Sequence, residues 1–218
     1  MNDAAGVMNA VRRALGRTAP MQSPPIPPAI ADAVARLVNT DKELPQLFAT
    51  RAMGNKMGVE FVTAEVLHAR LIDFIRSTNS RRLALPDSEF LQKLGVADAL
   101  RAAGFEVTLW PQMTLDALYD FDCAVTDVYR AVAETGSLVM RSSPQHGRAL
   151  SLVPAVHVAI LEPANFLPDL VDLFNLLRRE PSGPGITIIS GPSKTADIEM
   201  NLVTGVHGPG TVQALIVQ

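Results

Sequence analysis

Short apolar segments alternate with amphipathic helical segments along most of this chain, and this alternation limits its possible folds more than any other feature. The helical segments include residues 63–76, 88–103 (with a weak point at Gly95) and 167–177. Strands that alternate with helices predict a mainly parallel sheet covered on both faces. We therefore expect a three-layer α/β fold. Its predicted strands are residues 59–62, 83–85, 105–110, 123–126, 138–140, 155–161, 186–189 and 214–217.

One interval is too short for a helix and predicts a hairpin inserted into the sheet. Residues 125–141 have room for a strand, a turn at Glu134-Thr135-Gly136-Ser137 and a second strand. The tip would present Glu134, Thr135 and the N–H groups that flank Gly136. Because loops placed by a rigid scaffold often carry function, these three residues are candidate site residues.

Residues 186–189 predict a buried strand. The segment that follows this strand has the pattern of an anion-binding turn. Gly-Pro-Ser-Lys-Thr at 191–195 predicts a tight turn, and a short helix over 196–204 would follow it. The N–H groups of such a turn and the positive end of the helix dipole favour an anion, and Lys194 would add a full charge. The anion-binding candidates here are Gly191, Ser193, Lys194 and Thr195.

Two carboxylates and a histidine follow this turn. With Thr195 as N-cap, Asp197 and Glu199 fall in the first turn of the predicted helix, where negative side chains are stabilising. They are equally suited to acid–base chemistry or substrate orientation, because α/β sheets place their sites at the carboxyl ends of strands. His207 lies in Gly-Val-His-Gly-Pro (205–209), whose glycines permit close approach of a ligand. We take Asp197, Glu199 and His207 as catalytic candidates, with Glu134.

The remaining histidines and arginines have ordinary explanations as well as functional ones. His157 lies inside an apolar strand, which suits a core histidine at least as well as a catalytic one. Arg141 and Arg148 flank a loop that contains His146, and two arginines suit a carboxylate or phosphate ligand. Surface arginines without a specific partner are the alternative. No two histidines have a local metal-ligand spacing, so we predict no metal site.

Composition argues against several classes of protein. Nineteen basic against 22 acidic residues give a net charge of −3 without a basic tract, which argues against nucleic acid and anionic membranes as partners. No apolar run approaches a membrane span and the N-terminus lacks a signal-peptide pattern, so we expect a cytoplasmic protein. The single cysteine, Cys123, cannot by itself hold a four-cysteine iron–sulfur cluster. Rossmann and Walker motifs are absent from the sequence.

The N-terminal segment has a different character from the rest. Residues 3–15 predict an amphipathic helix, and five prolines between Pro20 and Pro28 favour an extended spacer. We therefore expect an arm over residues 1–28 and an α/β domain over 29–218. No residue distinguishes docking of the arm on its own domain from contact with a partner.

Four motifs are found in the second half of the chain. They are Ala-Glu-Thr-Gly-Ser-Leu-Val (133–139), Ser-Leu-Val-Pro (151–154) with His157, Gly-Pro-Ser-Lys-Thr-Ala-Asp-Ile-Glu (191–199) and Gly-Val-His-Gly-Pro (205–209). Together they resemble the LUD (lactate-utilisation) domain, and most of all its lactate-utilisation protein C (LutC/YkgG) branch. The resemblance extends from about residue 125 to the C-terminus.

The resemblance implies a fold like that of the NagB/RpiA/CoA-transferase superfamily and a role in oxidising L-lactate to pyruvate. In such a three-protein system the partners carry the iron–sulfur clusters, and this chain would be a non-autonomous component with a small-acid or cofactor-facing site. Lys194 and the turn would hold a carboxylate, and His207 would accept the hydroxyl proton. The chain's own cofactor stays unknown.

Two alternatives remain open. One is a stand-alone isomerase or CoA-transferase-like enzyme acting on a phosphorylated or CoA-linked acid, with Glu134 as base or nucleophile. The other is a pure assembly scaffold.

Overall fold

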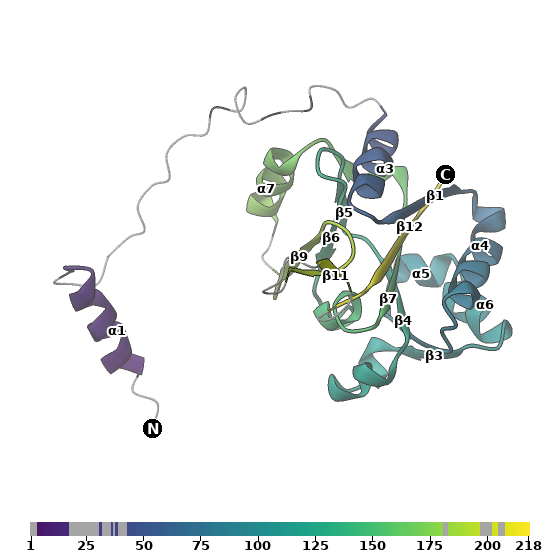
Figure 1. The fold of residues 1–218 in the computed structure, drawn as a ribbon, viewed down its shortest axis with the longest axis horizontal. Coiled ribbons are helices and arrows are strands. Elements are labelled where there is room, and N and C mark those ends of the chain that lie inside the picture. The colour runs from purple at the N-terminus through teal and green to yellow at the C-terminus, as the bar shows by residue number, and fades with distance from the viewer. Residues whose placement is uncertain are drawn as a thin grey trace. The chain divides into compact units, whose positions relative to one another are not determined.

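The computed structural model describes residues 4–17, 31, 36, 38, 43–180, 183–196, 202–204 and 208–218. The chain divides into two units, Met1–Ala35 and Arg36–Gln218, which are considered separately. In the first unit, helix α1 spans Ala4–Ala14, as its apolar pattern predicts (Figure 1). The proline-rich segment lies outside the described residues, and the predicted boundary after residue 28 stays a prediction.

The second unit contains all the other described elements. In chain order they are α3 (Leu44–Gly54), β1 (Gly58–Val62), α4 (Ala64–Ser77), β2 (Arg82–Leu85), α5 (Glu89–Lys93), α6 (Val96–Ala102), β3 (Glu106–Leu109), the 3-10 helices η1 (Trp110–Gln112) and η2 (Asp116–Asp120), β4 (Cys123–Asp127), β5 (Arg130–Val132), β6 (Ser137–Arg141), η3 (Arg148–Ser151), β7 (Val156–Leu161), η4 (Pro163–Asn165), β8 (Phe166–Leu167), α7 (Leu170–Arg179), β9 (Ile186–Ile189), β10 (Lys194–Ala196), β11 (Leu202–Thr204) and β12 (Thr211–Val217).

A six-stranded parallel sheet forms the centre of this unit, with the strand order β1-β12-β7-β4-β2-β3. Every pair in it is parallel; β7, for example, pairs with β12 on one side and β4 on the other. The α/β class and the mainly parallel sheet predicted from the alternating segments are therefore confirmed (Figure 1).

Helices α4, α5 and α6 cover one face of this sheet (Figure 1). Helix α4 begins after Thr63, and its residues Leu67, Leu71 and Ile75 recur at the spacing of a helix face and are almost fully buried. The predicted helix 88–103 is split at Gly95, whose φ of 63° is left-handed, into α5 and α6. The apolar core on this side therefore follows directly from the helical periodicity.

The opposite face is covered by a second sheet together with α3, rather than by helices alone. The second sheet has the order β8-β5-β6-β9, and β5 and β6 are the antiparallel hairpin predicted at 125–141. Phe48 of α3 packs between the two sheets and contacts Phe166 edge-on. Helix α7 covers the outer face of the second sheet through Leu173. Helices thus cover one face of the six-stranded sheet, and the second sheet with α3 covers the other.

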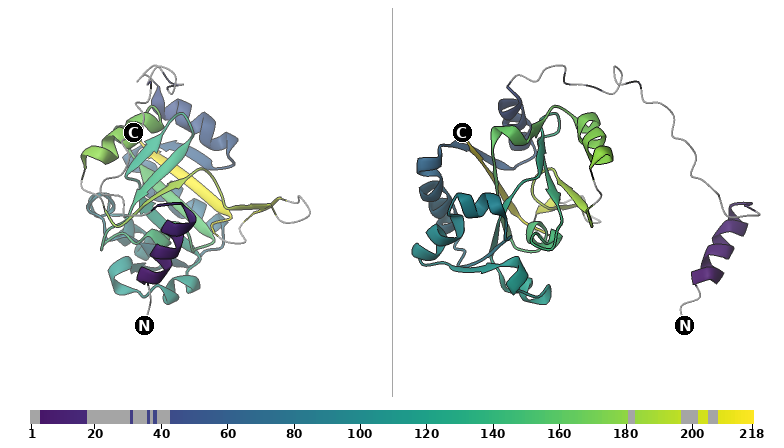
Figure 2. Two further views of the ribbon diagram at one scale, coloured as in Figure 1. Left: turned by 90° about the vertical axis from the view of Figure 1, so that its left-hand side faces the viewer. Right: turned by 180° about the vertical axis from the view of Figure 1, so that it is seen from behind.

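Two predictions around β9 are wrong. Residues 186–189 do not form a buried strand, because β9 lies at the edge of the second sheet with Ile186 and Ile188 36 % and 40 % exposed. The predicted helix from Ala196 is also wrong, because β10 is a strand that pairs antiparallel with β11. Figure 2 shows this ribbon projecting from the body of the second unit. An alternating apolar pattern that is only four residues long does not reveal which sheet it joins.

Among the residues with a described structure, no helix combines the length and the apolar character that crossing a lipid bilayer requires.

Replacing Leu71 tests the core on the helical face. Leu71→Ala removes a side chain that is fully buried between α4 and the sheet, and should lower the free energy of unfolding by about 2–5 kcal/mol. Val66→Ala, on the exposed side of the same helix, should change it by less than about 0.5 kcal/mol. Urea denaturation followed by circular dichroism measures both. Equal effects would contradict the orientation of α4.

Candidate functional site

Three of the sequence motifs meet at one pocket of about 310 Å³. The pocket lies between β9 and the segments that lead into the amino ends of β7 and β12. We call it the motif pocket. Its lining residues are Ser151, Leu152, Thr187, Ile188, Ile189, Ser190, Gly191, Pro192, Ser193, Gly208, Pro209 and Val212. The 151–154 motif lies well before the other two in the sequence, and the fold brings it against them, which the motif spacing alone could not show.

Glycines permit the close backbone packing around this pocket. The Ser193 N–H donates to the carbonyl of Pro209 at 2.8 Å, so the turn and the segment before β12 are in direct contact. Gly191 has a φ of 102°, and a Cβ at this residue would lie 2.3 Å from the carbonyl oxygen of Asn55. Any other residue at position 191 would therefore clash with the end of α3.

The hairpin tip packs against the same end of α3. Gly136 has a φ of 63°, and a Cβ there would lie 2.3 Å from the backbone nitrogen of Ala52. The side-chain amide of Asn55 donates to the carbonyl of Thr135 at 2.9 Å. Asn55 therefore contacts both the hairpin tip and the Gly191 turn. We did not predict a role for Asn55, although its place after Gly54 is typical of a residue that ends a helix.

A chain of hydroxyl groups connects the hairpin tip to the motif pocket. The Thr135 and Ser137 hydroxyls lie 2.7 Å apart, and the Ser137 hydroxyl is 2.7 Å from that of Ser190, which lines the pocket. Ser137 is buried, whereas Ser190 is exposed. Two predicted site segments, the tip and the turn, are thus joined by hydrogen bonds.

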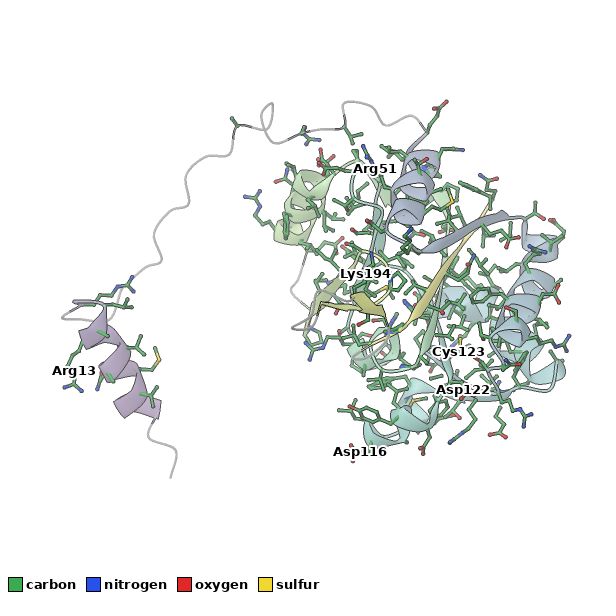
Figure 3. All side chains as sticks on the ribbon, in the orientation of Figure 1. Arg13, Arg51, Asp116, Asp122, Cys123 and Lys194 are labelled. Atoms are coloured by element: carbon green, nitrogen blue, oxygen red, sulfur yellow. The ribbon has the colours of Figure 1, made fainter. Side chains whose placement is uncertain are left out.

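Lys194 and Glu134 have structural partners in this arrangement. The Lys194 ammonium (labelled in Figure 3) donates to the Asn55 carbonyl at 3.3 Å, where the end of α3 favours a cation. The Glu134 carboxylate accepts from the N–H of Leu170 at 3.5 Å and so lies at the start of α7, where a negative charge is favoured. Neither residue lines the motif pocket.

The other predicted site residues are placed only in part. Arg148 is exposed and does not line the motif pocket. The backbone of Thr195 belongs to β10, so this residue is not a helix N-cap. Asp197, Glu199 and His207 lie outside the described residues, and their catalytic roles stay predictions.

His157 is a core histidine on the face of the six-stranded sheet that is opposite α4. Its Nε2 lies 2.8 Å from the Thr126 hydroxyl, whereas its Nδ1 has no hydrogen-bond partner among the residues described. Burial, and to a smaller extent the charge of His146, lowers the pKa of His157 to about 3. The imidazole is therefore neutral near pH 7.

Within the described ranges, no three His, Cys, Asp or Glu side chains are grouped so that they could hold a metal ion. Cys123 (Figure 3) is fully buried, and burial raises the pKa of its thiol. A thiol held in its protonated form is a poor nucleophile.

The fold and the pocket define a two-sheet α/β protein, and comparison with solved structures finds the same class. The crystal structure of a DUF162 family protein from Deinococcus radiodurans aligns with a TM-score of 0.59 at 20 % identity, over 83 % of this chain and 99 % of that one. This likeness concerns the fold. The LUD domain model matches residues 36–217, and the chain belongs to the LUD domain family.

Curated relatives place the chain in the lactate-utilisation protein C branch of this family. Lactate utilization protein C of Bacillus pumilus is 35 % identical over 51 % of each chain, and YkgG of Escherichia coli is 34 % identical over 59 % of each. The chain thus spans about half the length of these relatives. Lactate utilization protein C of Bacillus licheniformis is 24 % identical over 98 % of this chain and 95 % of that protein.

Substituting Gly136 tests the packing of the hairpin tip on α3. Gly136→Ala should lower the free energy of unfolding by about 2–4 kcal/mol, because it combines a left-handed residue with a clash against Ala52. Gly54→Ala is the matched control, since a Cβ at Gly54 meets nothing within 4 Å. Denaturant titration measures both variants. A stable Gly136→Ala protein would show that the tip does not pack on α3.

His157 should make stability depend on pH. An unfolded histidine binds a proton below about pH 6.5, whereas folded His157 stays neutral down to about pH 3. The unfolded state binds more protons between these values, so stability is lost as the pH falls through this range, by at most about 1.4 kcal/mol per pH unit. His157→Gln should flatten the profile from urea titrations at several pH values. His68→Gln, at a half-buried histidine on α4, is the control for the loss of a histidine elsewhere in the fold. If both variants flatten the pH profile equally, the pH dependence does not come from His157.

Proposed function

We propose that this chain is a non-autonomous component of a cytoplasmic system that oxidises L-lactate to pyruvate, with the motif pocket as its small-carboxylate or cofactor-facing site. The observation that carries the proposal is the convergence of three family motifs on one pocket. The name Lactate utilization protein C, borne by relatives such as that of Bacillus pumilus, supplies the substrate.

The chemistry of the pocket suits a small carboxylate. Ser151, Thr187, Ser190 and Ser193 bring hydroxyl groups to its wall, and hydroxyls donate hydrogen bonds to carboxylate oxygens. The apolar side chains of Ile189 and Val212 leave room for a methyl group. His207 directly precedes Gly208, which lines the pocket, and we assign it the removal of the hydroxyl proton.

The redox balance of the reaction requires partners. Oxidation of lactate to pyruvate releases two electrons and two protons, and a chain with a single buried cysteine cannot hold a cysteine-ligated cluster to accept the electrons. We propose that iron–sulfur partner proteins receive them. This division of labour is why the chain is not expected to turn over lactate alone.

Affinity purification of the tagged chain from its native cytoplasm under anaerobic conditions tests the proposal. Iron–sulfur proteins should co-purify, and the assembly should reduce a dye in the presence of L-lactate. A chain that purifies alone and turns over an acyl-CoA or a sugar phosphate would instead support the isomerase or transferase alternative.

Variants within that assembly test the pocket. His207→Ala should lower lactate-dependent dye reduction by about a hundredfold or more through loss of the proton acceptor. Ser193→Val should weaken lactate binding and raise KM, because the hydroxyl on the pocket wall is lost. Lys93→Ala, at an exposed residue of α5, is the control and should leave both constants unchanged. Full activity in all three variants would indicate a scaffold.

A further inference from the structure

A second pocket, of about 330 Å³, lies at the carboxyl ends of β2 and β4. None of its lining residues lines the motif pocket. We call it the switch-point pocket. It is lined by Asp87, Ser88, Asp127, Tyr129, Arg141, Ser142, Ser143, Gln145 and His146. Its volume falls within the range of small-molecule sites.

The sheet topology singles out this position. From β2 the chain continues through α5 and α6 to β3 on one side, whereas from β4 it continues to β7 on the other side. Adjacent strands whose connections leave in opposite directions define a topological switch point, and open α/β sheets bind ligands in the crevice at its carboxyl end. Asp87 follows β2 and Asp127 ends β4, so both carboxylates lie at that crevice.

The motif pocket is lined by Thr187, Ile188 and Ile189 of β9, whereas the switch-point pocket is lined by Arg141 of β6 and by no residue of β9. Leu138 pairs with Ile189 at the end beside the motif pocket, and Arg141 pairs with Ile186 at the end beside the switch-point pocket. A ligand in one pocket therefore need not occupy the other.

Two polar atoms at the switch-point pocket are buried without a hydrogen-bond partner in the described part of the chain, namely Asp127 Oδ1 and His146 Nε2. His146 Nδ1 lies 3.3 Å from Asp127 Oδ1, a contact at ion-pair distance without hydrogen-bond geometry. A buried polar atom without a hydrogen-bond partner lowers the stability of the fold. The two side chains at this wall therefore carry hydrogen-bonding capacity that the described residues do not use.

The charges around the pocket argue against an anion. Arg141 Nη1 contacts Glu180 Oε2 at 2.6 Å, and the Tyr129 hydroxyl donates to the same carboxylate. The guanidinium charge is thus already offset, and Asp87 and Asp127 add two carboxylates to the wall. A phosphate or carboxylate group here would meet more negative than positive charge.

Hydrogen-bond donors and acceptors both line the pocket. A ligand group that both donates and accepts hydrogen bonds therefore fits it best. Carboxylates accept only, whereas the amide of Gln145 and the hydroxyl of Ser142 can donate. An ammonium group only donates and a fully ionised phosphate only accepts, but a hydroxyl does both. We propose that the switch-point pocket binds the vicinal diol of a small uncharged ligand, either a free sugar or the ribose of a nucleoside.

Calorimetric titration of the full chain with four probes tests this inference. D-ribose and adenosine carry the diol and separate the two sources, 2′-deoxyadenosine lacks it, and ethanolamine carries an ammonium group. Adenosine, D-ribose or both should bind, and 2′-deoxyadenosine should bind about tenfold more weakly than adenosine if adenosine binds. Equal binding of the deoxy compound, binding of ethanolamine alone, or no binding of any probe at millimolar concentration would overturn the proposal.

A variant and a map of the bound state locate the site. Asp127→Asn should weaken the diol ligand about tenfold, whereas Asp98→Asn, at a carboxylate that is 90 % exposed on α6, should not change its affinity. Amide chemical shifts of the unaltered protein give the same information if Asp127→Asn does not fold. The ligand should shift residues 87–88, 127 and 142–146; shifts confined to 187–193 would overturn the assignment. Lactate oxidation by the assembled system is a separate readout, so either proposal can fail without the other.

Discussion

The end of helix α3 is the contact on which the arrangement of the motifs depends. The side-chain amide of Asn55 donates to the carbonyl of Thr135 at the hairpin tip, and its backbone carbonyl accepts from Lys194. The same carbonyl lies so close to position 191 that only a glycine fits there. Gly136 packs on the same turn of α3. Two loops from different parts of the chain are thus held by one helix end, and the hydroxyls of Ser137 and Ser190 meet as a result. Gly136 and Gly191 thus have a packing explanation that needs no ligand.

That explanation changes the meaning of several motif residues. A glycine and a lysine beside a turn suggest an anion cradle from sequence, yet Lys194 neutralises a helix end and no helix begins at Ala196. Glu134 likewise stabilises the start of α7. The described residues that line the motif pocket offer hydroxyl groups and no charged side chain. The small acid that we propose as its ligand would therefore be recognised there by hydrogen bonds rather than by charge.

Sequence periodicity was sufficient to predict the parallel sheet, the buried face of α4 and the β5–β6 hairpin, because each of these depends on local patterns of burial. It was not sufficient for β9, whose four residues fit a central strand as well as an edge strand. It also could not reveal Asn55 or the Asp127–His146 contact, which join residues that are far apart in the chain. Of the described residues that the sequence suggested as site candidates, only Gly191 and Ser193 line the motif pocket, because the rest of its lining depends on how the chain folds.

His157 shows where packing and polarity conflict in this fold. Its partner in β12 is Val212, which lines the motif pocket, and the charge that acts on it comes from His146, which lines the switch-point pocket. A neutral imidazole needs two hydrogen-bond partners, and only Nε2 has one within the described residues. An apolar side chain would fill this position in the core without that cost. Conflicts of this kind are expected near functional sites, and this one involves one lining residue of each pocket that we assign to a ligand.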